Sequence, residues 1–336
     1  MNNERPVRLG ILGCSDIARR RTLPAALKVP EVTVTAVASR RADTARAVAA
    51  EFGGDAVAGY EALLEQPDVD AVYISLPTGL HHEWTVRALR AGKHVLAEKP
   101  LTDRYPDTVA AVRLADSLGL TLRENLTFTQ HSLHDAVHKM LGEGAIGELR
   151  SMTSEFGFPP LPAGNVRYRA DLAGGSLLDA GVYPLAAASM FLGPDLDVVG
   201  ATLRRGAGTE VDVAGDVLLC APDGRTAHVA FGFEHAYRCA YTLWGSEGRI
   251  VVERAFTPPP DFRPRVRLER ADGEREHVLP ADDQFAGTLT AFARAVTGGG
   301  AAARSTHVVA RARLVAQVRD RARLLGDGWS GGADGR

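Results

Sequence analysis

The chain has 336 residues, of which 45% are apolar and 24% are charged, a composition typical of a globular protein with two domains. Its formal charge of -2 gives no electrostatic reason to expect nucleic acid or an anionic membrane as a partner, and it favours a small ligand. The cysteines, Cys14, Cys220 and Cys239, are too few and too widely spaced for a disulfide framework or a cysteine-based zinc site. The first apolar run, VRLGILG, is too short for a signal peptide or a membrane span. We therefore expect a cytoplasmic protein.

The first third of the chain alternates short apolar runs with amphipathic stretches. We expect strands at 7–12, 32–38, 70–77, 93–98 and 120–125, and helices at 16–27, 41–53, 81–92 and 107–119. Continuous Val, Ile and Leu runs joined by helices predict a parallel sheet that is covered on both faces and binds ligands at the carboxyl ends of its strands. Residues 1–125 are thus predicted to form an α/β domain of the Rossmann type, a dinucleotide-binding fold.

Beyond this domain, strands follow one another directly, at 148–158, 196–205, 216–222, 226–235, 239–245 and 249–256. Turn signals such as PDGR and GSEG separate some of them, which predicts a large antiparallel sheet. An apolar helix at 175–193 should cover one face, and the helical tail at 305–326 should pack back on the body. Residues 126–336 are therefore predicted to form an α+β domain with an open-faced sheet. The uncovered face predicts a homodimer or homotetramer.

The stretch GILGCSDIA is a glycine turn directly after a strand and before a helix. A dinucleotide fingerprint needs such a turn, so that the pyrophosphate can approach the backbone at a helix N-terminus. Ser15 stands where the second glycine usually is, and Ala18 replaces the third, so an ordinary strand-to-helix turn is the alternative. The position at the start of a βαβ series favours the fingerprint. The expected cofactor contacts are Gly10, Gly13, Cys14, Ser15, Asp16 and Ile17.

The end of the second predicted strand indicates which dinucleotide binds. An acidic residue there would accept from the 2′-hydroxyl of NAD, whereas this chain has Ser39, Arg40 and Arg41. Two guanidinium groups can bind a 2′-phosphate, which predicts NADP(H) as the cofactor. The alternative is that both arginines are solvated residues at a helix start.

The stretch AGKHVLAEKP ends an apolar strand with Glu98, Lys99 and Pro100. Pro100 restricts the preceding residue to extended geometry, which places Lys99 on a stiff turn at the ligand edge of the sheet. All other basic residues are arginine except Lys28, Lys93 and Lys139. Arginine would serve an ion pair equally well but cannot release its proton, so a lysine retained here is a plausible proton donor. Alternatively, Lys99 pairs only with Glu98 or a cofactor phosphate.

The motifs GILGCSDIA, LPTGLHHEW, AGKHVLAEKP and GGSLLDAGVYP, in this order, resemble the glucose-fructose oxidoreductase and inositol dehydrogenase family. The resemblance covers nearly the whole chain and implies a nicotinamide cofactor with Lys99 near the reacting carbon. It also implies a second catalytic cluster at Asp179 and at the residue four further on. That residue is histidine in many relatives and Tyr183 here, which suits ketone reduction better than oxidation of a stable alcohol.

Within the family, the stretches HVLAEKPLT, LLDAGVYP, FGFEHAY, FTPPP and DDQFA look most like NADP-dependent sugar 3-ketoreductases of deoxysugar antibiotic pathways. The resemblance implies hydride transfer to the C-3 ketone of a dTDP-linked 3,4-diketo-2,6-dideoxyhexose. Lys99 would donate the proton, Tyr183 would hydrogen-bond the oxygen, and Asp179 would hold the lysine. Which of Lys99 and Tyr183 gives the final proton stays open. A half-buried aromatic packing role is the alternative for Tyr183.

Further residues are expected at the ligand side. Leu76 and Pro77 would wall the nicotinamide, and His81, Glu98 and Asn125 are counted with the cofactor contacts. The sugar-nucleotide pocket is expected to include Arg167, Tyr168, Asp179, Tyr183, Glu234, His235, Tyr237, Phe256 and Gln284. A basic residue such as Arg167 would bind the diphosphate, and aromatic side chains would stack on thymine.

His131, His134 and His138 share one face of a predicted helix, which superficially resembles a metal site. No carboxylate or cysteine pattern completes it, so we expect no metal and interpret these residues as solvated or capping histidines. Two other functions remain open, an oxidising polyol or aldose dehydrogenase of the same fold and a dinucleotide-binding sensor without activity. The joint presence of Lys99, Asp179 and Tyr183 speaks against the sensor.

Overall fold

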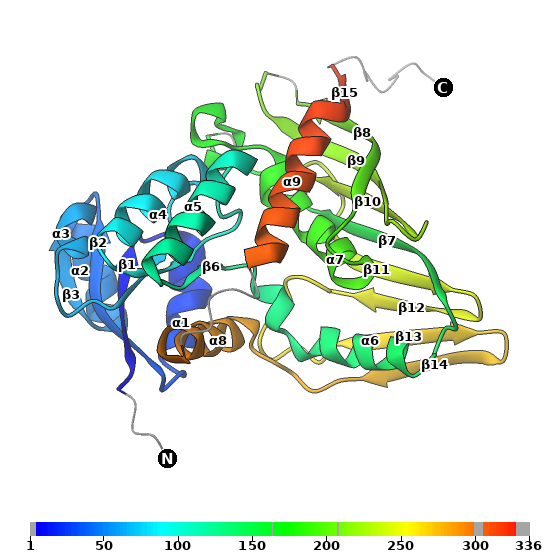
Figure 1. The fold of residues 1–336 in the computed structure, drawn as a ribbon, viewed down its shortest axis with the longest axis horizontal. Helices are drawn as coiled ribbons and strands as arrows, with labels where there is room; N and C mark the ends of the chain where they lie inside the picture. The colour runs from blue at the N-terminus through cyan, green and yellow to red at the C-terminus, as the bar shows by residue number, and fades with distance from the viewer. Residues whose placement is uncertain (1–4, 163, 207, 299–304, 327–336) are drawn as a thin grey trace. The chain divides into compact units, whose positions relative to one another are not determined.

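The computed structural model describes residues 5–162, 164–206, 208–298 and 305–326. The chain divides into two compact units (Figure 1). Unit 1 comprises Met1–His131 and Asp282–Val309, and unit 2 comprises Ser132–Ala281 and Ala310–Arg336.

Unit 1 is built on a parallel sheet of six strands in the order β3-β2-β1-β4-β5-β6. The strands are β1 Val7–Leu12, β2 Val32–Ser39, β3 Asp55–Ala58, β4 Ala71–Ile74, β5 His94–Ala97 and β6 Leu122–Glu124. The longer helices are α2 Ala42–Phe52, α4 His81–Arg90, α5 Tyr105–Leu118 and α8 Gln284–Gly298. The shorter ones are η1 Ala18–Thr22, α1 Leu23–Ala26, α3 Tyr60–Leu64, η2 Thr78–Leu80 and η3 Thr127–Gln130. Strand order reverses between β1 and β4, and ligands of open parallel sheets bind at such a switch point. The predicted Rossmann domain is confirmed.

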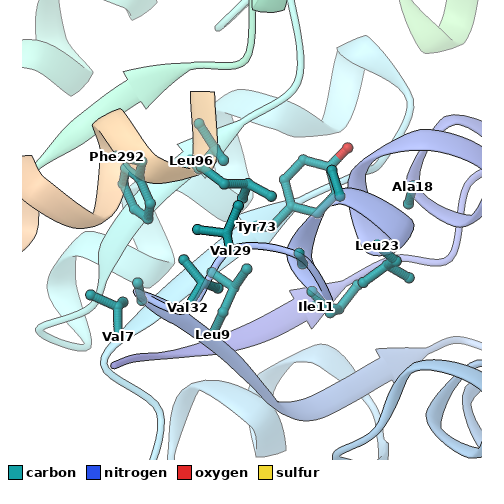
Figure 2. Packing of buried hydrophobic residues seen from close by; sticks show 14 of the residues in the cluster. Val7, Leu9, Ile11, Ala18, Leu23, Val29, Val32, Tyr73, Leu96 and Phe292 are labelled. Carbon is teal, nitrogen blue, oxygen red and sulfur yellow. The ribbon is translucent and has the colours of Figure 1, made fainter. Parts of the chain in front are cut away.

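Alternate residues of these strands face opposite sides of the sheet. Leu9, Ile11 and Tyr73 belong to the core on one face, which α1, α2 and α8 help to form (Figure 2). Leu12 and Val72 belong to the core on the other face, beneath α3, α4 and α5. The central strands β1, β4 and β5 are therefore buried on both sides, as their continuous apolar sequences predicted.

Helix α8 departs from the expected domain boundary. Leu289 and Phe292 are 0% exposed and pack into the core of unit 1, although we had assigned all of residues 126–336 to the second domain. The chain therefore returns to the first unit after completing most of the second. Position along the chain does not reveal which sheet an amphipathic helix covers, because any apolar sheet face of suitable shape can accept it.

Unit 2 contains a sheet of nine strands in the order β14-β13-β12-β11-β7-β10-β9-β8-β15. The strands are β7 Leu149–Gly157, β8 Asp197–Arg205, β9 Asp212–Cys220, β10 Thr226–Gly232, β11 Arg238–Gly245, β12 Gly248–Glu253, β13 Arg265–Arg270, β14 Gly273–Val278 and β15 Ala322–Leu325. The helices are α6 Ser132–Gly142, η4 Val166–Tyr168, η5 Ala170–Leu172, η6 Leu177–Gly181, α7 Val182–Leu192 and α9 Ser305–Arg321, which starts in unit 1. Most pairings are antiparallel, as expected, but β10 with β7 and β15 with β8 are parallel.

Helix α7 packs against β7 and β10, which agrees with the expected helix on one face of the sheet. Within the described residues, only Ala170–Leu192 is long and apolar enough to cross a membrane, and 83% of its most apolar window is buried inside the protein. A helix that is apolar on all sides is expected in the core of a globular domain. Length and composition are therefore weak evidence for a membrane span here.

The C-terminal helix packs on unit 2 through polar contacts with the start of β8. Gln317 accepts from the backbone N–H of Val198 at 3.1 Å and donates to Asp197 at 2.7 Å. Four strands escaped the sequence analysis, namely β3, β13, β14 and β15. Strand β14 is exposed along its whole length, so it lacks the apolar alternation that identifies a half-buried strand.

Candidate functional site

The glycine turn of unit 1 is tightly constrained. Gly13 has φ +99°, and a Cβ at this position would lie 2.6 Å from the Ser75 carbonyl oxygen and 2.7 Å from Leu76 Cδ2. Only glycine fits, because both the backbone angle and the space exclude a side chain. The turn therefore lies against the end of β4, at the switch point of the sheet, where a dinucleotide fingerprint needs it.

Ser15 explains how the chain departs from the usual glycine pattern. Its hydroxyl shares a short hydrogen bond with the Ser75 hydroxyl and accepts from the backbone N–H of Ala18 at 3.2 Å. The side chain thus caps the following helical turn and contacts the neighbouring strand end. A serine that turns toward the protein in this way is compatible with a phosphate-binding turn.

The other residues of this stretch differ in their roles. Gly10 lies within β1, and a Cβ there would lie 2.8 Å from Leu63 Cδ2. This glycine lets α3 pack against the sheet, and its expected contact with the cofactor stays a prediction. Burial raises the pKa of the half-buried Cys14 thiol. Asp16 and Ile17 are exposed at the start of the helix, where they are available to a ligand.

Arg40 and Arg41 follow the carboxyl end of β2 and are exposed. Neither forms an ion pair within the described part of the chain, whereas nearby Arg19 and Arg46 pair with carboxylates. The Ser39 hydroxyl accepts from the backbone N–H of Arg41 at 3.3 Å. Two guanidinium groups without a carboxylate partner leave a positive site at the strand end, which fits a phosphate group.

Glu98 is buried and bonded within the protein. Its carboxylate accepts from the Tyr73 hydroxyl and from Asn125 Nδ2, both at 2.6 Å, and from the backbone N–H of Lys99 at 3.3 Å. Because Tyr73 donates to Glu98, the Thr22 hydroxyl donates to Tyr73 at 3.0 Å. The side chains of Glu98 and Asn125 therefore hold strand ends together, and their expected contact with the cofactor stays a prediction.

Lys99 lies two residues after the end of β5 and is half-buried. The bond between Lys99 and Pro100 is a cis peptide, and Pro100 is buried. The two charges that end this strand thus have different environments. Glu98 faces the interior, while Lys99 sits at the edge where ligands of parallel sheets bind.

His81 links the two strand ends of unit 1 that carry expected ligand residues. Its Nδ1 lies 2.7 Å from the Pro100 carbonyl oxygen, its Nε2 lies 2.8 Å from the Leu76 carbonyl oxygen, and the residue is 1% exposed. Both ring nitrogens therefore face main-chain carbonyls and not a cofactor, contrary to our expectation. A neutral imidazole donates to only one of them. His81 thus fixes the turn that carries Lys99 relative to the walls at Leu76 and Pro77.

In unit 2, the motif at residues 174–184 presents two side chains. From residue 175 to residue 189, only Asp179 and Tyr183 are not buried. The Asp179 carboxylate accepts from Arg167 Nε at 2.7 Å. The Tyr183 ring packs edge-on against Phe156, with centroids 4.9 Å apart, and lies 5.9 Å from Phe256. The four-residue spacing therefore places a carboxylate and a phenol together on the outer side of an otherwise buried helix.

The other predicted pocket residues of unit 2 differ in how exposed they are. Glu234, His235 and Tyr237 are exposed in the turn between β10 and β11, while Arg167 and Tyr168 are partly exposed. The Tyr168 hydroxyl accepts from the backbone N–H of Leu161 at 3.1 Å, and Glu234 pairs with Arg204 at 2.7 Å.

Two residues do not fit the expected pocket. Phe256 is 0% exposed and supports the Tyr183 ring, so it has no surface for substrate. Gln284 is 3% exposed and starts α8, in unit 1. Phe256 and Gln284 are predicted pocket residues because of sequence likeness, which does not report side-chain burial.

The three helical histidines form no metal site. No group of three or more His, Cys, Asp or Glu that could hold a metal occurs in the residues that the structure describes. His134 binds the Tyr241 hydroxyl and the Ala255 carbonyl, each at 3.1 Å, and the His138 ring packs at a tilt against Phe191. His131 and His134 are 1% and 2% exposed, so the expectation that these two are solvated is wrong.

Several residues of the site were missed by sequence reasoning. Ser75 could have been found, because it lies near the carboxyl end of the strand predicted at 70–77, at the ligand edge of the sheet. Tyr73 and Thr22 carry no such signal, since nothing in a strand or helix pattern shows that a hydroxyl will meet a buried carboxylate. Asp212 carries none either. Its carboxylate accepts from the Ser176 hydroxyl at 2.7 Å, a contact between distant parts of the chain.

Unit 1 has the fold and the glycine turn of a dinucleotide-binding protein, with a basic site at the end of its second strand. Residues 7–126 match the model of an oxidoreductase family with an NAD-binding Rossmann fold, and residues 134–251 match the GFO/IDH/MocA C-terminal domain. The chain belongs to this family of oxidoreductases, which confirms the resemblance found in its motifs.

Close relatives share nearly the full length of the chain. A dTDP-3,4-didehydro-2,6-dideoxy-alpha-D-glucose 3-reductase of Actinomadura kijaniata is 52% identical over 297 residues, covering 88% of this chain and 90% of the relative. One of the same name from Streptomyces violaceoruber is 50% identical over 331 residues, covering 96% and 97%. A crystal structure of a 3-ketoreductase from Actinomadura kijaniata with NADP and TDP-benzene has a TM-score of 0.93 at 50% identity, covering 96% of this chain and 99% of the other.

The environment of His81 predicts a dependence of stability on pH. Burial lowers the pKa of His81 from its ordinary value of 6.5, against the opposing effect of the two carbonyl groups. The unfolded chain then binds a proton more readily than the folded protein, so stability falls as the pH drops below about 6.5. We expect His81→Gln to lose this contribution, giving a shallower decline of the thermal unfolding midpoint between about pH 7 and about pH 5.

The matched control is His277→Gln, at an exposed histidine on β14, which should keep the steeper decline of the parent protein. If the His81→Gln midpoint follows pH in parallel with the parent, the assignment of this acid sensitivity to His81 is wrong.

Proposed function

We propose that the protein is an NADPH-dependent reductase that acts on the C-3 ketone of a dTDP-linked 3,4-diketo-2,6-dideoxyhexose. Reductases with this name are about half identical to the chain over most of its length. The observation that carries the proposal is the partly exposed pair of Asp179 and Tyr183 on an otherwise buried helix. The Tyr183 phenol can donate a hydrogen bond, so it suits stabilisation of a developing alkoxide better than removal of a proton from an alcohol.

The cofactor is held by unit 1. The turn at Gly13 and the helix start at Ser15 receive the pyrophosphate, because free N–H groups of a helix start favour anions. Arg40 and Arg41 bind the 2′-phosphate, for which they have no competing carboxylate partner in the described residues. Bound NADPH supplies the hydride for the reduction. Leu76 and Pro77 shield the nicotinamide side from water.

Negative charge develops on the C-3 oxygen during the reduction, and two donors meet it. Lys99 donates the proton, since it is the basic side chain that can lose one at the ligand edge of the sheet. Tyr183 hydrogen-bonds the same oxygen through its phenol. The contact of Asp179 with Arg167 orients the Asp179 carboxylate.

The nucleotide part of the substrate requires groups for a base and a diphosphate. Arg167 offers a guanidinium for the diphosphate, and Tyr168 and Tyr237 offer rings for the base. Glu234 and His235 offer hydrogen-bonding groups in the exposed turn beside Tyr237.

Removal of the proton donor provides the most direct test. We expect Lys99→Ala to lower kcat by roughly 10²- to 10³-fold, the usual effect of losing one positioned donor, with little change in NADPH affinity. The measurement is the rate of NADPH oxidation, followed by absorbance, with the dTDP-linked diketo sugar as substrate. Lys139→Ala is the control, because Lys139 is exposed and paired with Glu143 at 3.9 Å on α6.

A Lys99→Ala enzyme that turns over at the parental rate would remove this residue from the mechanism. Reduction of NADP by free aldoses or inositol, without oxidation of NADPH by the keto sugar, would identify a dehydrogenase instead. Cofactor binding without turnover of either kind would identify a sensor.

The arginine pair predicts the choice of cofactor. We expect Arg40→Asp to raise KM for NADPH at least about tenfold and to improve the use of NADH, because charge-assisted hydrogen bonds are worth about 1.5–3 kcal/mol. The measurement is kcat/KM with each cofactor. Arg113→Asp, at an exposed position on α5, should leave the ratio unchanged. An unchanged ratio for Arg40→Asp would place the 2′-phosphate elsewhere.

Cytoplasmic location and self-association through the sheet of unit 2 stay predictions. Trp244 on β11 is 64% exposed, and Val199 on β8 and Leu218 on β9 are 60% and 43% exposed. Exposed apolar side chains on a sheet favour contact with another copy. We expect a dimer or tetramer by light scattering, and Trp244→Glu should shift the mass toward the monomer. A parent protein that is monomeric at micromolar concentration would contradict this expectation.

A further inference from the structure

Asp212 contacts the start of the helical segment that carries Asp179 and Tyr183, the two partly exposed residues of this segment. It is the first residue of β9, and its Oδ2 accepts from the Ser176 hydroxyl at 2.7 Å and from the Leu177 backbone N–H at 2.6 Å. Ser176 is 0% exposed. Leu177 begins the helical turn that includes Asp179 and leads into α7 with Tyr183. One carboxylate thus binds both the side chain and the backbone at the beginning of this helix.

Two glycines bring the segment into this contact. Gly175 has φ +115°, and a Cβ there would collide with Asp212 Oδ1. A Cβ at Gly174 would collide with the main-chain carbonyl of Arg167. The start of the helix is therefore held between a carboxylate on one side and a backbone segment on the other. Any side chain at either glycine would push it away.

The helix is also closely packed further along, near Tyr183. A Cβ at Gly181 would lie 3.1 Å from the Phe231 ring, so the helix approaches β10 closely at this point. The Tyr183 ring lies on Phe156 of β7. Because a helix is stiff, a shift at Leu177 would move Asp179 and Tyr183 with it. The contact at Asp212 thus contributes to where the phenol and the carboxylate point.

Burying a carboxylate costs more desolvation free energy than burying a neutral capping group. Burial raises the pKa of Asp212, against the lowering effect of its bonds to Ser176 and Leu177. The protein therefore keeps a partly desolvated charge where a neutral acceptor could cap the same two donors. A charged acceptor gives shorter and stronger hydrogen bonds than a neutral one. This favours a role that needs a firmly held helix start.

We propose that Asp212 is a positioning residue for the reaction and acts through Tyr183, because its bonds to Ser176 and Leu177 fix the start of the helix that carries this phenol. The inference rests on the proposed function in one respect, namely that Tyr183 hydrogen-bonds the ketone oxygen. Asp212 itself acts only through the helix.

The test is Asp212→Asn in the full-length protein, because asparagine keeps the shape and one acceptor but loses the charge. We expect kcat to fall roughly tenfold to a hundredfold, as small misplacements of a reacting group do. KM for NADPH should stay unchanged, because the cofactor residues lie in unit 1. Asp216→Asn is the control, since Asp216 is exposed on the same strand and pairs with His228 at 3.3 Å. It should retain the parental kcat.

A double-mutant cycle with Tyr183→Phe separates positioning from general loss of stability. If Asp212 acts through Tyr183, adding Asp212→Asn to Tyr183→Phe should lower kcat by less than threefold further, because the same interaction is already lost. Ser176→Ala removes one of the two donors, so it should show a smaller effect with the same non-additivity. It also provides the test if Asp212→Asn does not fold.

The outcomes separate the two proposals. A Tyr183→Phe enzyme with the parental kcat would overturn the role of Tyr183, and the positioning role of Asp212 with it. An impaired Tyr183→Phe enzyme together with a fully active or strictly multiplicative Asp212→Asn would overturn the positioning role alone.

Discussion

The ligand side of unit 1 depends on the hydrogen bonds of the buried Glu98 carboxylate. It connects the end of β5 to Tyr73 on β4 and to Asn125 after β6, and through Tyr73 to Thr22 in the helix after the glycine turn. Leaving one buried partner of such a network unsatisfied costs roughly 1–3 kcal/mol, so the members hold one another in place. The strand therefore ends on two charges for two different reasons. Glu98 fixes the strand ends, and Lys99 is presented at the edge that they form.

The two units share one arrangement, in which a glycine lets a polar group approach the start of a helix. In unit 1, Gly13 packs against the Ser75 carbonyl while the Ser15 hydroxyl caps the helical turn. In unit 2, Gly175 packs against Asp212 while Ser176 donates to the same carboxylate. The arrangement in unit 1 positions main-chain N–H groups for a cofactor, and that in unit 2 positions side chains on the face of a core helix. In each case only a residue without a Cβ lets the backbone approach the neighbouring oxygen so closely.

Several predicted site residues have contacts that their motifs do not reveal. Gly10, Glu98 and Phe256 all lie within or beside functional motifs, yet their environment is the protein interior. Gly10 accommodates Leu63, Glu98 binds Tyr73, and Phe256 supports the Tyr183 ring. A motif reports that a residue lies near the site along the chain. It does not report the direction of the side chain, which neighbouring elements decide.

The sequence by itself determined the Rossmann unit, the sheet-rich second unit and the family, and it identified Gly13, Lys99, Asp179 and Tyr183 as candidate site residues. These features are local, because strand periodicity, a glycine turn and a four-residue helical spacing can all be recognised within short windows. Only the tertiary structure decided that α8 belongs to unit 1, that His81 bridges two carbonyl groups, and that Asp212 holds the helix start at Ser176. These features join residues far apart in the chain. They depend on which surfaces pack together, and no local pattern encodes that.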